Sequence, residues 1–288
     1  MILYFKDKDI KNKRNLRRKK MKKLIALDLD GTLLDDRKEI TEKTRKSLIK
    51  AQQRGSTVIL ASGRPTPGLY SQAEALELGK YHGLLLSYNG GKVTDYTTGE
   101  IIYENSIDNS LAKEFLRHLE SFDVNPIVED GKNIYTDKPH GFKNDFESQQ
   151  NHLGIVKVEN ICDYISYNPV KILIAAPAEI LDPQIEKITA PFEGRLSFVK
   201  SAPFYLEATP LGVNKAGSLQ IVCDRLGFKR EQLVSFGDAE NDLSMIEFAG
   251  IGVAMANACE KLKRAANMVT LSNNEDGIAY ALKKLGIA

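Results

Sequence analysis

The stretch KKLIALDLDGTLLDD, residues 22–36, places two aspartates, Asp28 and Asp30, directly after an apolar run. Side chains two residues apart in a strand share a side, so both carboxylates can leave the strand's end together. Gly31 permits a sharp exit. Two like charges this close repel each other unless one is protonated or a cation lies between them. Mg²⁺ is the expected cation, because it prefers oxygen ligands and often binds phosphates. Two solvated acids in a turn would show the same spacing.

A second apolar run, VILA, is followed by Ser62, Gly63 and Arg64. A hydroxyl, a flexible backbone and a guanidinium can all donate hydrogen bonds to a phosphate group. Pro65 suits the first turn of a helix, whose free N–H groups favour an anion. This stretch therefore predicts a phosphate-binding loop.

Two later stretches add a lysine and further acids. Lys215, in LGVNKAGSL, opens a helical stretch, although a surface lysine would fit the same position. The run LVSFGDAENDLSMI ends an apolar strand with Asp238 and continues through Glu240, Asn241 and Asp242. Asp238 is a further candidate metal carboxylate and Asn241 a neutral donor, whereas Glu240 fits a solvated surface acid.

Together these residue types fit the transfer of a phosphoryl group. One aspartate can attack phosphorus and form an aspartyl-phosphate. Mg²⁺ and Lys215 would neutralise the charge on the transferred group. Asp30 would give a proton to the leaving oxygen and later take one from the attacking water.

Short apolar runs that alternate with helical patterns must position these residues. The expected strands are residues 24–27, 57–61, 83–87, 233–236, 251–254 and 268–270, and the helical stretches include 41–53, 65–78, 243–248, 260–266 and 278–285. This alternation indicates a parallel sheet covered on both faces. Ligands of open α/β sheets bind at the carboxyl ends of the strands, where the polar residues above occur.

The middle of the chain has another pattern. Residues 92–106 alternate apolar and polar side chains, as antiparallel strands do, and further strands are expected at 170–176 and 196–208. Helices are expected at 111–119 and 183–189. We therefore predict an α/β fold: a Rossmann-like parallel sheet with an inserted α+β domain. The predicted boundaries are a disordered extension at 1–20, a core domain at 21–88 and 209–288, and the inserted domain at 89–208.

The composition fits a globular protein in a reducing compartment. The 288 residues are 42% apolar and 27% charged, as is usual for such proteins. No apolar run approaches the roughly 18 residues that span a bilayer. Three distant cysteines and four histidines without metal spacing indicate reduced thiols rather than disulfides or a zinc site. We expect a cytoplasmic protein without a membrane partner.

Basic residues are concentrated at the amino terminus. Residues 1–20 carry a charge of about +7, so the remainder carries about −5. Such an arm could contact nucleic acid or an acidic membrane. A disordered extension explains it as well, so nucleic acid is not an expected partner.

The ordered motifs resemble those of the haloacid dehalogenase superfamily of phosphatases, in particular its Cof-type branch with a type-IIB cap. The resemblance runs from Met21 to the carboxyl terminus. The four motifs are Asp28-Leu29-Asp30-Gly31-Thr32, Ser62-Gly63-Arg64, Lys215, and Gly237-Asp238-Ala239-Glu240-Asn241-Asp242. Tyr88-Asn89-Gly90, KSAPFYLEATPLGVNK and AGIGVAMANA are similar to the branch's own patterns, and KSAPFYLE resembles its bacterial sugar-phosphate phosphatases.

The resemblance implies a role for each motif residue. Asp28 would be the nucleophile and Asp30 the acid/base. Mg²⁺ would be held by the Asp28 side chain, the Asp30 backbone carbonyl and Asp238, with Asp242 orienting a water on the metal. The expected phosphate and substrate contacts are Ser62, Gly63, Arg64, Asn89, Lys215 and Asn241. Ser62 stands where threonine is commoner, Gly91 where alanine is usual, and Ala208 where a larger apolar residue is typical.

The leading hypothesis is a Mg²⁺-dependent phosphatase for small phosphorylated metabolites, with sugar phosphates as the expected class. Phosphomannomutase-like transfer is the first alternative, and a requirement for a hexose bisphosphate would reveal it. A non-catalytic phospho-acceptor module is the second, although it would have no use for the insertion. Asp30 favours hydrolysis or mutase chemistry, because superfamily members that only pass phosphate through an aspartate lack this carboxylate.

Side chains of the insertion must select the substrate, because the core motifs contact only phosphate and metal. Polar and aromatic candidates are Tyr135, Lys138, Lys143, Phe204 and Tyr205. Each of them also fits an ordinary packing or surface role.

Overall fold

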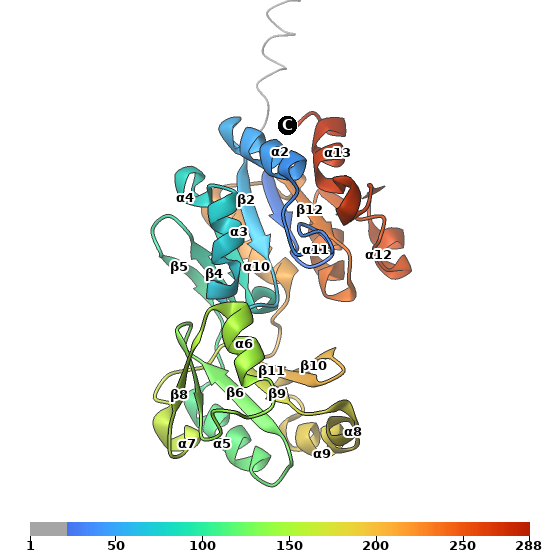
Figure 1. Cartoon of the computed structure of the whole chain (residues 1–288). Coiled ribbons are helices and arrows are strands. Elements are labelled where there is room, and N and C mark those ends of the chain that lie inside the picture. Colours follow the sequence, from blue (N-terminus) through green and yellow to red (C-terminus); the bar gives the residue numbers. More distant parts are fainter. Residues whose placement is uncertain (1–21) are drawn as a thin grey trace, which may run out of the picture.

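The computed structural model describes residues 22–288 and contains two sheets, each with its own helices (Figure 1). The basic extension predicted at residues 1–20, with its possible contact to nucleic acid, lies outside the described residues. Below, "core" means the part built on the first sheet and "cap" means residues 109–209, which build the second.

The first sheet has eight strands in the order β14-β13-β12-β1-β2-β3-β4-β5. Their bounds are β1 (Leu24–Leu27), β2 (Thr57–Ala61), β3 (Leu84–Ser87), β4 (Lys92–Asp95), β5 (Ile101–Glu104), β12 (Leu233–Gly237), β13 (Ile251–Ala254) and β14 (Met268–Val269). The strands from β14 to β3 pair in parallel, which confirms the α/β prediction. The antiparallel pair β4–β5 also joins this sheet, although it belongs to the stretch 89–208 assigned above to the inserted domain.

Helices cover both faces of the first sheet. Apolar side chains of α2 (Glu42–Gln53), α3 (Tyr70–Ala75) and α13 (Gly277–Lys284) pack on one face, and those of α10 (Lys215–Leu226) and α11 (Leu243–Phe248) pack on the other. The remaining short helices of the core are α4 (Leu78–Tyr81), α12 (Glu260–Ala265), η1 (Thr66–Leu69), η2 (Tyr88–Gly90), η5 (Arg230–Gln232), η6 (Glu240–Asp242) and η7 (Asn273–Glu275). Burial on both faces explains why the parallel strands are continuously apolar.

The second sheet has six strands in the order β10-β11-β9-β6-β7-β8. Their bounds are β6 (Asn125–Glu129), β7 (Asn133–Thr136), β8 (Gly154–Lys157), β9 (Ile172–Ala175), β10 (Ser197–Ala202) and β11 (Tyr205–Thr209). The helices of the cap are α5 (Asn109–Leu119), α6 (Asn144–Asn151), α7 (Ile161–Tyr164), α8 (Ala178–Leu181), α9 (Ile185–Thr189), η3 (Asp182–Gln184) and η4 (Ala190–Phe192). The stretch 196–208, expected as one strand, is the hairpin β10–β11.

Alternating side chains give the two faces of the cap sheet different surroundings. Leu206 and Ala208 of β11 pack with Phe115 of α5 in the apolar cluster beneath the sheet. Tyr205 and Glu207 of the same strand point the other way, toward the core, and both line a cleft there. Strand β11 thus supplies two side chains to the cap's apolar core and two to the cleft.

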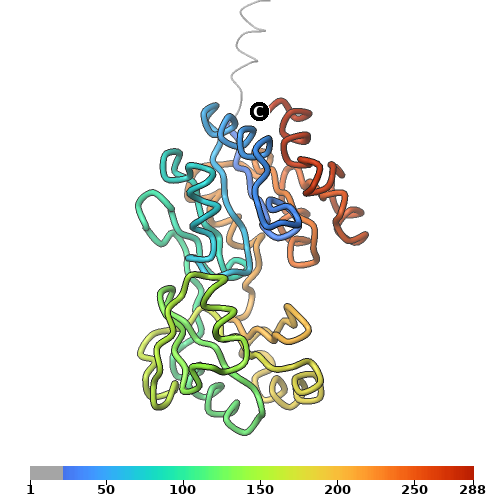
Figure 2. Tube along the Cα trace, in the orientation of Figure 1, coloured from blue at the N-terminus to red at the C-terminus, as the bar shows by residue number. Residues whose placement is uncertain are grey.

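Two segments of chain connect the core with the cap, one after β5 and one before α10 (Figure 2). Close to the second segment, α10 packs against η2 of the core, where Ser218 Oγ donates to the carbonyl of Gly90 at 2.5 Å. Gly90 has φ +106°, and a Cβ there would lie 2.4 Å from the carbonyl oxygen of Asn214. Only glycine fits this conformation and this approach.

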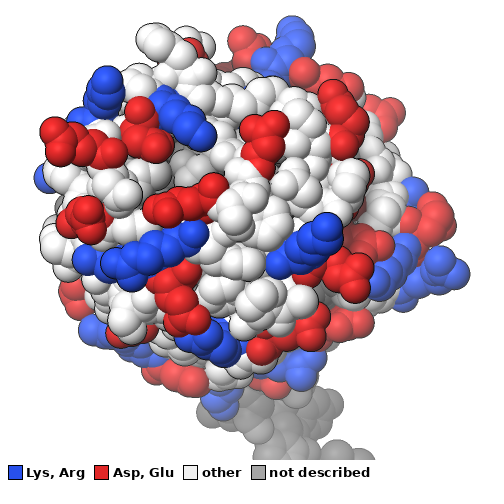
Figure 3. Space-filling view, turned by 90° about the horizontal axis from the view of Figure 1, so that it is seen from below, with Lys and Arg blue, Asp and Glu red and all other residues white. Residues whose placement is uncertain are grey.

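Within residues 22–288, no helix is long and apolar enough to cross a membrane. Figure 3 views the molecule from the cap end, and acidic and basic side chains are intermingled over that face.

We predict that Gly90→Ala lowers the free energy of unfolding by more than about 1 kcal/mol, because a Cβ adds both backbone strain and a clash. Gly131→Ala is the matched control: Gly131 also has positive φ, but its Cβ would meet nothing within 4 Å. Denaturant unfolding of both variants measures the difference. Equal losses of stability would show that the contact with Asn214 contributes nothing.

Candidate active site

Three adjacent strands of the first sheet bring the predicted motifs together. Asp28 follows β1, Ser62 follows β2 and Asp238 follows β12, and these strands are neighbours in the order β12-β1-β2. All three pair in parallel, so their carboxyl ends meet at one edge. Residues separated by more than two hundred positions in the sequence thus share one site, as the sequence pattern predicted.

Lys215 lies at the first position of α10, and its side chain is completely buried. Its Nζ donates to Asp28 Oδ1 at 2.7 Å and to Asp242 Oδ1 at 2.6 Å. Burial by itself would lower the pKa of Lys215, but the carboxylates of Asp242 and Asp28 outweigh it and raise that pKa. The ammonium therefore stays charged and joins α10 to β1 and η6.

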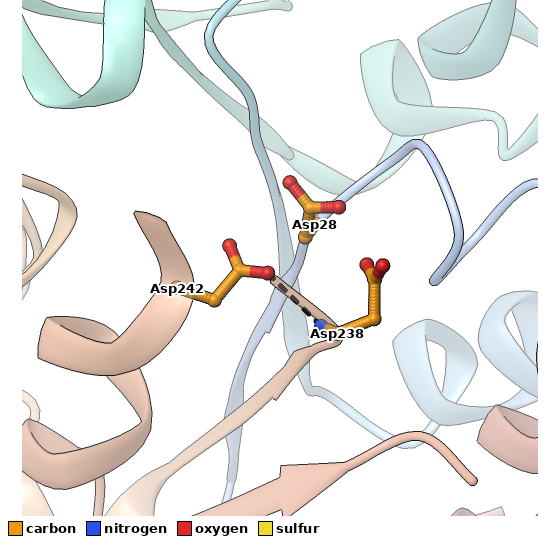
Figure 4. A group of neighbouring side chains, drawn as sticks. All are labelled: Asp28, Asp238 and Asp242. Carbon is orange, nitrogen blue, oxygen red and sulfur yellow. Dashed lines mark hydrogen bonds between the residues drawn. The ribbon is translucent and has the colours of Figure 1, made fainter. Parts of the chain in front are cut away.

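Both carboxylate oxygens of Asp242 accept hydrogen bonds. Its Oδ2 accepts a hydrogen bond from the backbone N–H of Asp238 at 3.0 Å (Figure 4). It also accepts one from the backbone N–H of Ala239 at 3.1 Å. The chain must approach this side chain closely, since a Cβ on Gly237 would lie 2.5 Å from the Cβ of Asp242. These contacts fix Asp242, which in turn orients Lys215.

Asp28, Asp238 and Asp242 form a group of carboxylates that could hold a metal ion, with oxygens within 4.8 Å of one another (Figure 4). Burial and the charge of Asp242 raise the pKa of Asp28 to about 8. Burial also raises the pKa of Asp238, against a 2.7 Å hydrogen bond from Thr32 Oγ1. A divalent cation would relieve the cost of crowding these charges, so the oxygen donors present fit such an ion.

Asp30 is paired with two cations. Arg64 Nη2 lies 2.8 Å from Asp30 Oδ2, and Lys38 Nζ lies 2.9 Å from Asp30 Oδ1. Burial would raise the pKa of Asp30, but the hydrogen bond from Lys38 and the charge of Arg64 outweigh it and lower that pKa. Lys38 was not predicted from the sequence, because a lysine in a charged turn has no distinguishing pattern.

The phosphate-binding candidates also lie together. Ser62 is buried, and its carbonyl accepts from the backbone N–H of Asn89 at 2.9 Å. Asn241 Nδ2 donates to Asn89 Oδ1 at 3.2 Å. A Cβ on Gly63 would lie 2.9 Å from Asn89 Nδ2, so a side chain at this position would push Asn89 away. Asn89 itself has a left-handed backbone, with φ 53°.

A cleft of about 320 Å³ lies between the core and the cap above these residues. Its core wall includes Asp28, Asp30, Ser62, Arg64 and Asn241. Its cap wall includes Glu147, Gln150, Asn151, Lys171, Tyr205 and Glu207. The cap wall is thus predominantly polar and carries charges of both signs.

Of the five substrate-contact candidates in the insertion, only Tyr205 lines this cleft. Its hydroxyl donates to Glu147 Oε1 at 2.7 Å. Tyr135 instead donates to Asp130, and the ammonium of Lys143 lies 4.1 Å from the ring centroid of Phe204. Lys138 lines a separate, small pocket of the cap. The acids, amides and lysine of the cap wall were missed, because only the folded sheet shows which face they occupy.

Comparison with known proteins identifies the family. The model of the haloacid dehalogenase-like hydrolases matches residues 25–282. The chain belongs to this family. It is a phosphatase, a phosphoric monoester hydrolase acting on small phosphorylated metabolites.

Relatives of this haloacid dehalogenase-like hydrolase match over nearly its whole length. A 5-amino-6-(5-phospho-D-ribitylamino)uracil phosphatase of Bacillus subtilis is 32% identical over 276 residues, which cover 91% of this chain and 96% of the relative. The crystal structure of a haloacid dehalogenase-like hydrolase from Bacteroides thetaiotaomicron is 37% identical with a TM-score of 0.87, and the match covers 92% of this chain and 99% of that one. A HAD subclass IIB sugar phosphatase is 26% identical with a TM-score of 0.75, covering 92% of this chain and 100% of that one.

We predict that Lys215→Met destabilises the fold by about 3–5 kcal/mol, because it leaves two buried carboxylates without their cation. Denaturant unfolding in EDTA measures this loss without interference from bound metal. Lys200→Met is the matched control, because Lys200 forms an exposed pair with Asp182 on the cap. It should change stability little. A small loss for Lys215→Met would contradict the role assigned to the buried ammonium.

Proposed function

We propose that this chain is a Mg²⁺-dependent phosphatase that hydrolyses sugar phosphates and related polyol phosphates through an aspartyl-phosphate on Asp28. The observation that carries the proposal is the buried contact of Lys215 with Asp28 and Asp242, directly beneath a cleft with a polar cap wall. The site thus combines a nucleophile, a fixed positive charge and a cleft for a hydrophilic leaving group.

In the first step, a carboxylate oxygen of Asp28 attacks phosphorus, and the bond between phosphorus and the leaving oxygen breaks. Asp30 donates its proton to that oxygen, so the product leaves as an alcohol. In the second step, Asp30 takes a proton from water, whose oxygen attacks phosphorus and displaces Asp28. Lys215 neutralises charge near the transferred group throughout, while Ser62 and the loop after β2 donate hydrogen bonds to its oxygens.

Asp28 and Asp238 would hold Mg²⁺, with Asp242 beside them. When bound, the ion supplies positive charge that stabilises the phosphoryl oxygens and counters the repulsion between Asp28 and the substrate.

Arg64 must change partners for this chemistry. Its guanidinium forms three contacts of 2.8 to 3.1 Å with the carboxylate of Asp30. That contact favours charged Asp30, whereas the first step needs the proton on it. A phosphate dianion attracts a guanidinium more strongly than one carboxylate does. We infer that the incoming phosphate draws Arg64 from Asp30 and so prepares the acid.

The cap wall supports polyol substrates. Carboxylates, amides and a phenol hydroxyl suit the hydroxyl groups of a sugar or alditol, and few apolar side chains are present to hold a hydrophobic leaving group. Two relatives are consistent with this class: one is named a sugar phosphatase, and the other acts on a phosphoribityl compound.

The mutase alternative requires a second phosphate on the sugar. The charged residues of the cap wall are two acids, Glu147 and Glu207, and one base, Lys171, so this wall has an excess negative charge. A second phosphate there would be repelled. This observation favours hydrolysis of monophosphates over transfer that depends on a hexose bisphosphate.

We predict that Asp28→Asn lowers phosphate release by at least about 10³-fold, because an amide cannot form the covalent intermediate. The assay uses phosphorylated sugars and alditols, nucleotides, pyridoxal phosphate and an aryl phosphate, each with and without a hexose bisphosphate. Asp36→Asn, an exposed acid in the following turn, is the control and should keep its activity. Hydrolysis of no ester by the wild type would overturn the proposal, and activity only with the bisphosphate would favour the mutase.

We also predict that Mg²⁺ raises the Tm of the wild type with increasing concentration, since an ion bound only by the folded state stabilises it. Asp238→Asn should abolish most of this increase by removing one carboxylate. Thermal unfolding in EDTA and in a Mg²⁺ series measures it without any substrate. An equal Mg²⁺-dependent increase in the variant would show that Asp238 does not hold the ion.

A further inference from the structure

The cap wall of the cleft contains one ion pair, Lys171 with Glu207, among the residues that line it. Lys171 Nζ lies 3.2 Å from Glu207 Oε1. The two side chains are only 9% and 10% exposed. Burying such a pair is costly, and it seldom adds stability over apolar side chains of the same size. Its presence on the wall facing the reaction therefore points to a role in binding.

The cap sheet fixes the direction in which the pair points. Glu207 of β11 lies opposite Leu173 of β9, and Lys171 is two residues before Leu173. Two residues directly opposite each other on neighbouring strands share a face of the sheet, and so do residues two positions apart on one strand. Lys171, Leu173 and Glu207 therefore all face the core. The alternate residues of β9 pack into the apolar cluster below, which prevents the strand from turning the pair away.

Lys171 also reaches the phosphate loop of the core. Its Nζ donates to the carbonyl of Gly63 at 3.2 Å. Gly63 lies between Ser62 and Arg64, so the ammonium is adjacent to the place where the phosphoryl group would lie. The pair consequently faces the first carbons of the leaving group rather than its distant end.

The hydrogen bonds of the pair leave one donor and one acceptor. A lysine ammonium has three N–H groups, and two of them are used by Glu207 and Gly63. Within residues 22–288, Glu207 Oε2 has no hydrogen-bond partner. A hydroxyl group can accept from the third N–H and donate to this oxygen at once. A carboxylate or phosphate could use only the lysine and would be repelled by Glu207.

We propose that Lys171 and Glu207 determine specificity by binding a hydroxyl group on the carbon next to the phosphoester carbon. The substrate class is then sugar and polyol monophosphates that carry a hydroxyl at that carbon. This inference rests on the proposed phosphatase function and deepens it.

The test compares two substrates that differ by this hydroxyl alone. Glycerol 1-phosphate has it, and 3-hydroxypropyl phosphate has the same carbon chain without it. We expect the wild type, with Mg²⁺, to show a kcat/KM about 10- to 100-fold higher for glycerol 1-phosphate, because the second substrate leaves the third N–H of Lys171 and Oε2 of Glu207 without a hydrogen-bond partner.

Two variants then test whether the preference for glycerol 1-phosphate comes from the Lys171–Glu207 pair. Lys171→Met and Glu207→Gln should each reduce the ratio of the two kcat/KM values to near one. Glu114→Gln is the matched control: Glu114 forms an ion pair with Arg195 on the cap, and neither lines the cleft. The control should keep the wild-type ratio.

Each outcome decides a separate question. Equal kcat/KM for the two substrates in the wild type overturns the inference about the pair, even if a variant fails to fold. A wild-type ratio in both variants also overturns it. If this ratio is kept while kcat/KM falls equally for both substrates, Lys171 is a contact that only closes the cap. Failure to hydrolyse any ester, p-nitrophenyl phosphate included, instead rejects the underlying phosphatase proposal.

Discussion

The buried ammonium of Lys215 is the interaction on which the site depends. It carries a positive charge with no exposure to solvent, held between Asp28 and Asp242. Removing the lysine would leave like charges together in a medium of low polarity, so the three residues stabilise one another only as a set. This set ties α10, which returns from the cap, to the carboxyl ends of β1 and β12. The chain segment that closes the insertion is thereby fixed to Asp28.

The cap sheet must meet two physical requirements at once. Its strands must bury apolar side chains to be stable and still present polar groups to a substrate. Alternation along β11 meets both needs, since Leu206 and Ala208 pack below while Tyr205 and Glu207 face the cleft. Helix α6 adds Glu147 and Asn151 to the same wall. The residues that line the cap wall of the cleft therefore belong to the same strand and helix that build the cap.

The elements of the core were predicted from the sequence more completely than those of the cap. Runs such as LIAL and VILA predicted strands of a parallel sheet, because a strand buried on both faces is continuously apolar. Helix α6 was missed, since NDFESQQN has little apolar periodicity and begins after Lys143, whose φ is 70°. The antiparallel strands β4 and β5 were expected in the insertion, because half-exposed alternating strands give no sign of which sheet they will join.

The sequence by itself determined which core residues gather at one edge of the sheet: Asp28, Ser62 and Asp238 each directly follow a strand, and parallel strands must bring their carboxyl ends together. Only the tertiary structure decided the partners. It placed Lys215 between Asp28 and Asp242, paired Asp30 with Arg64 and Lys38, and brought Lys171 of the cap to the carbonyl of Gly63 in the core. The reason is that these contacts join separate strands, helices and loops, whose relative positions are set by tertiary packing that no local pattern encodes.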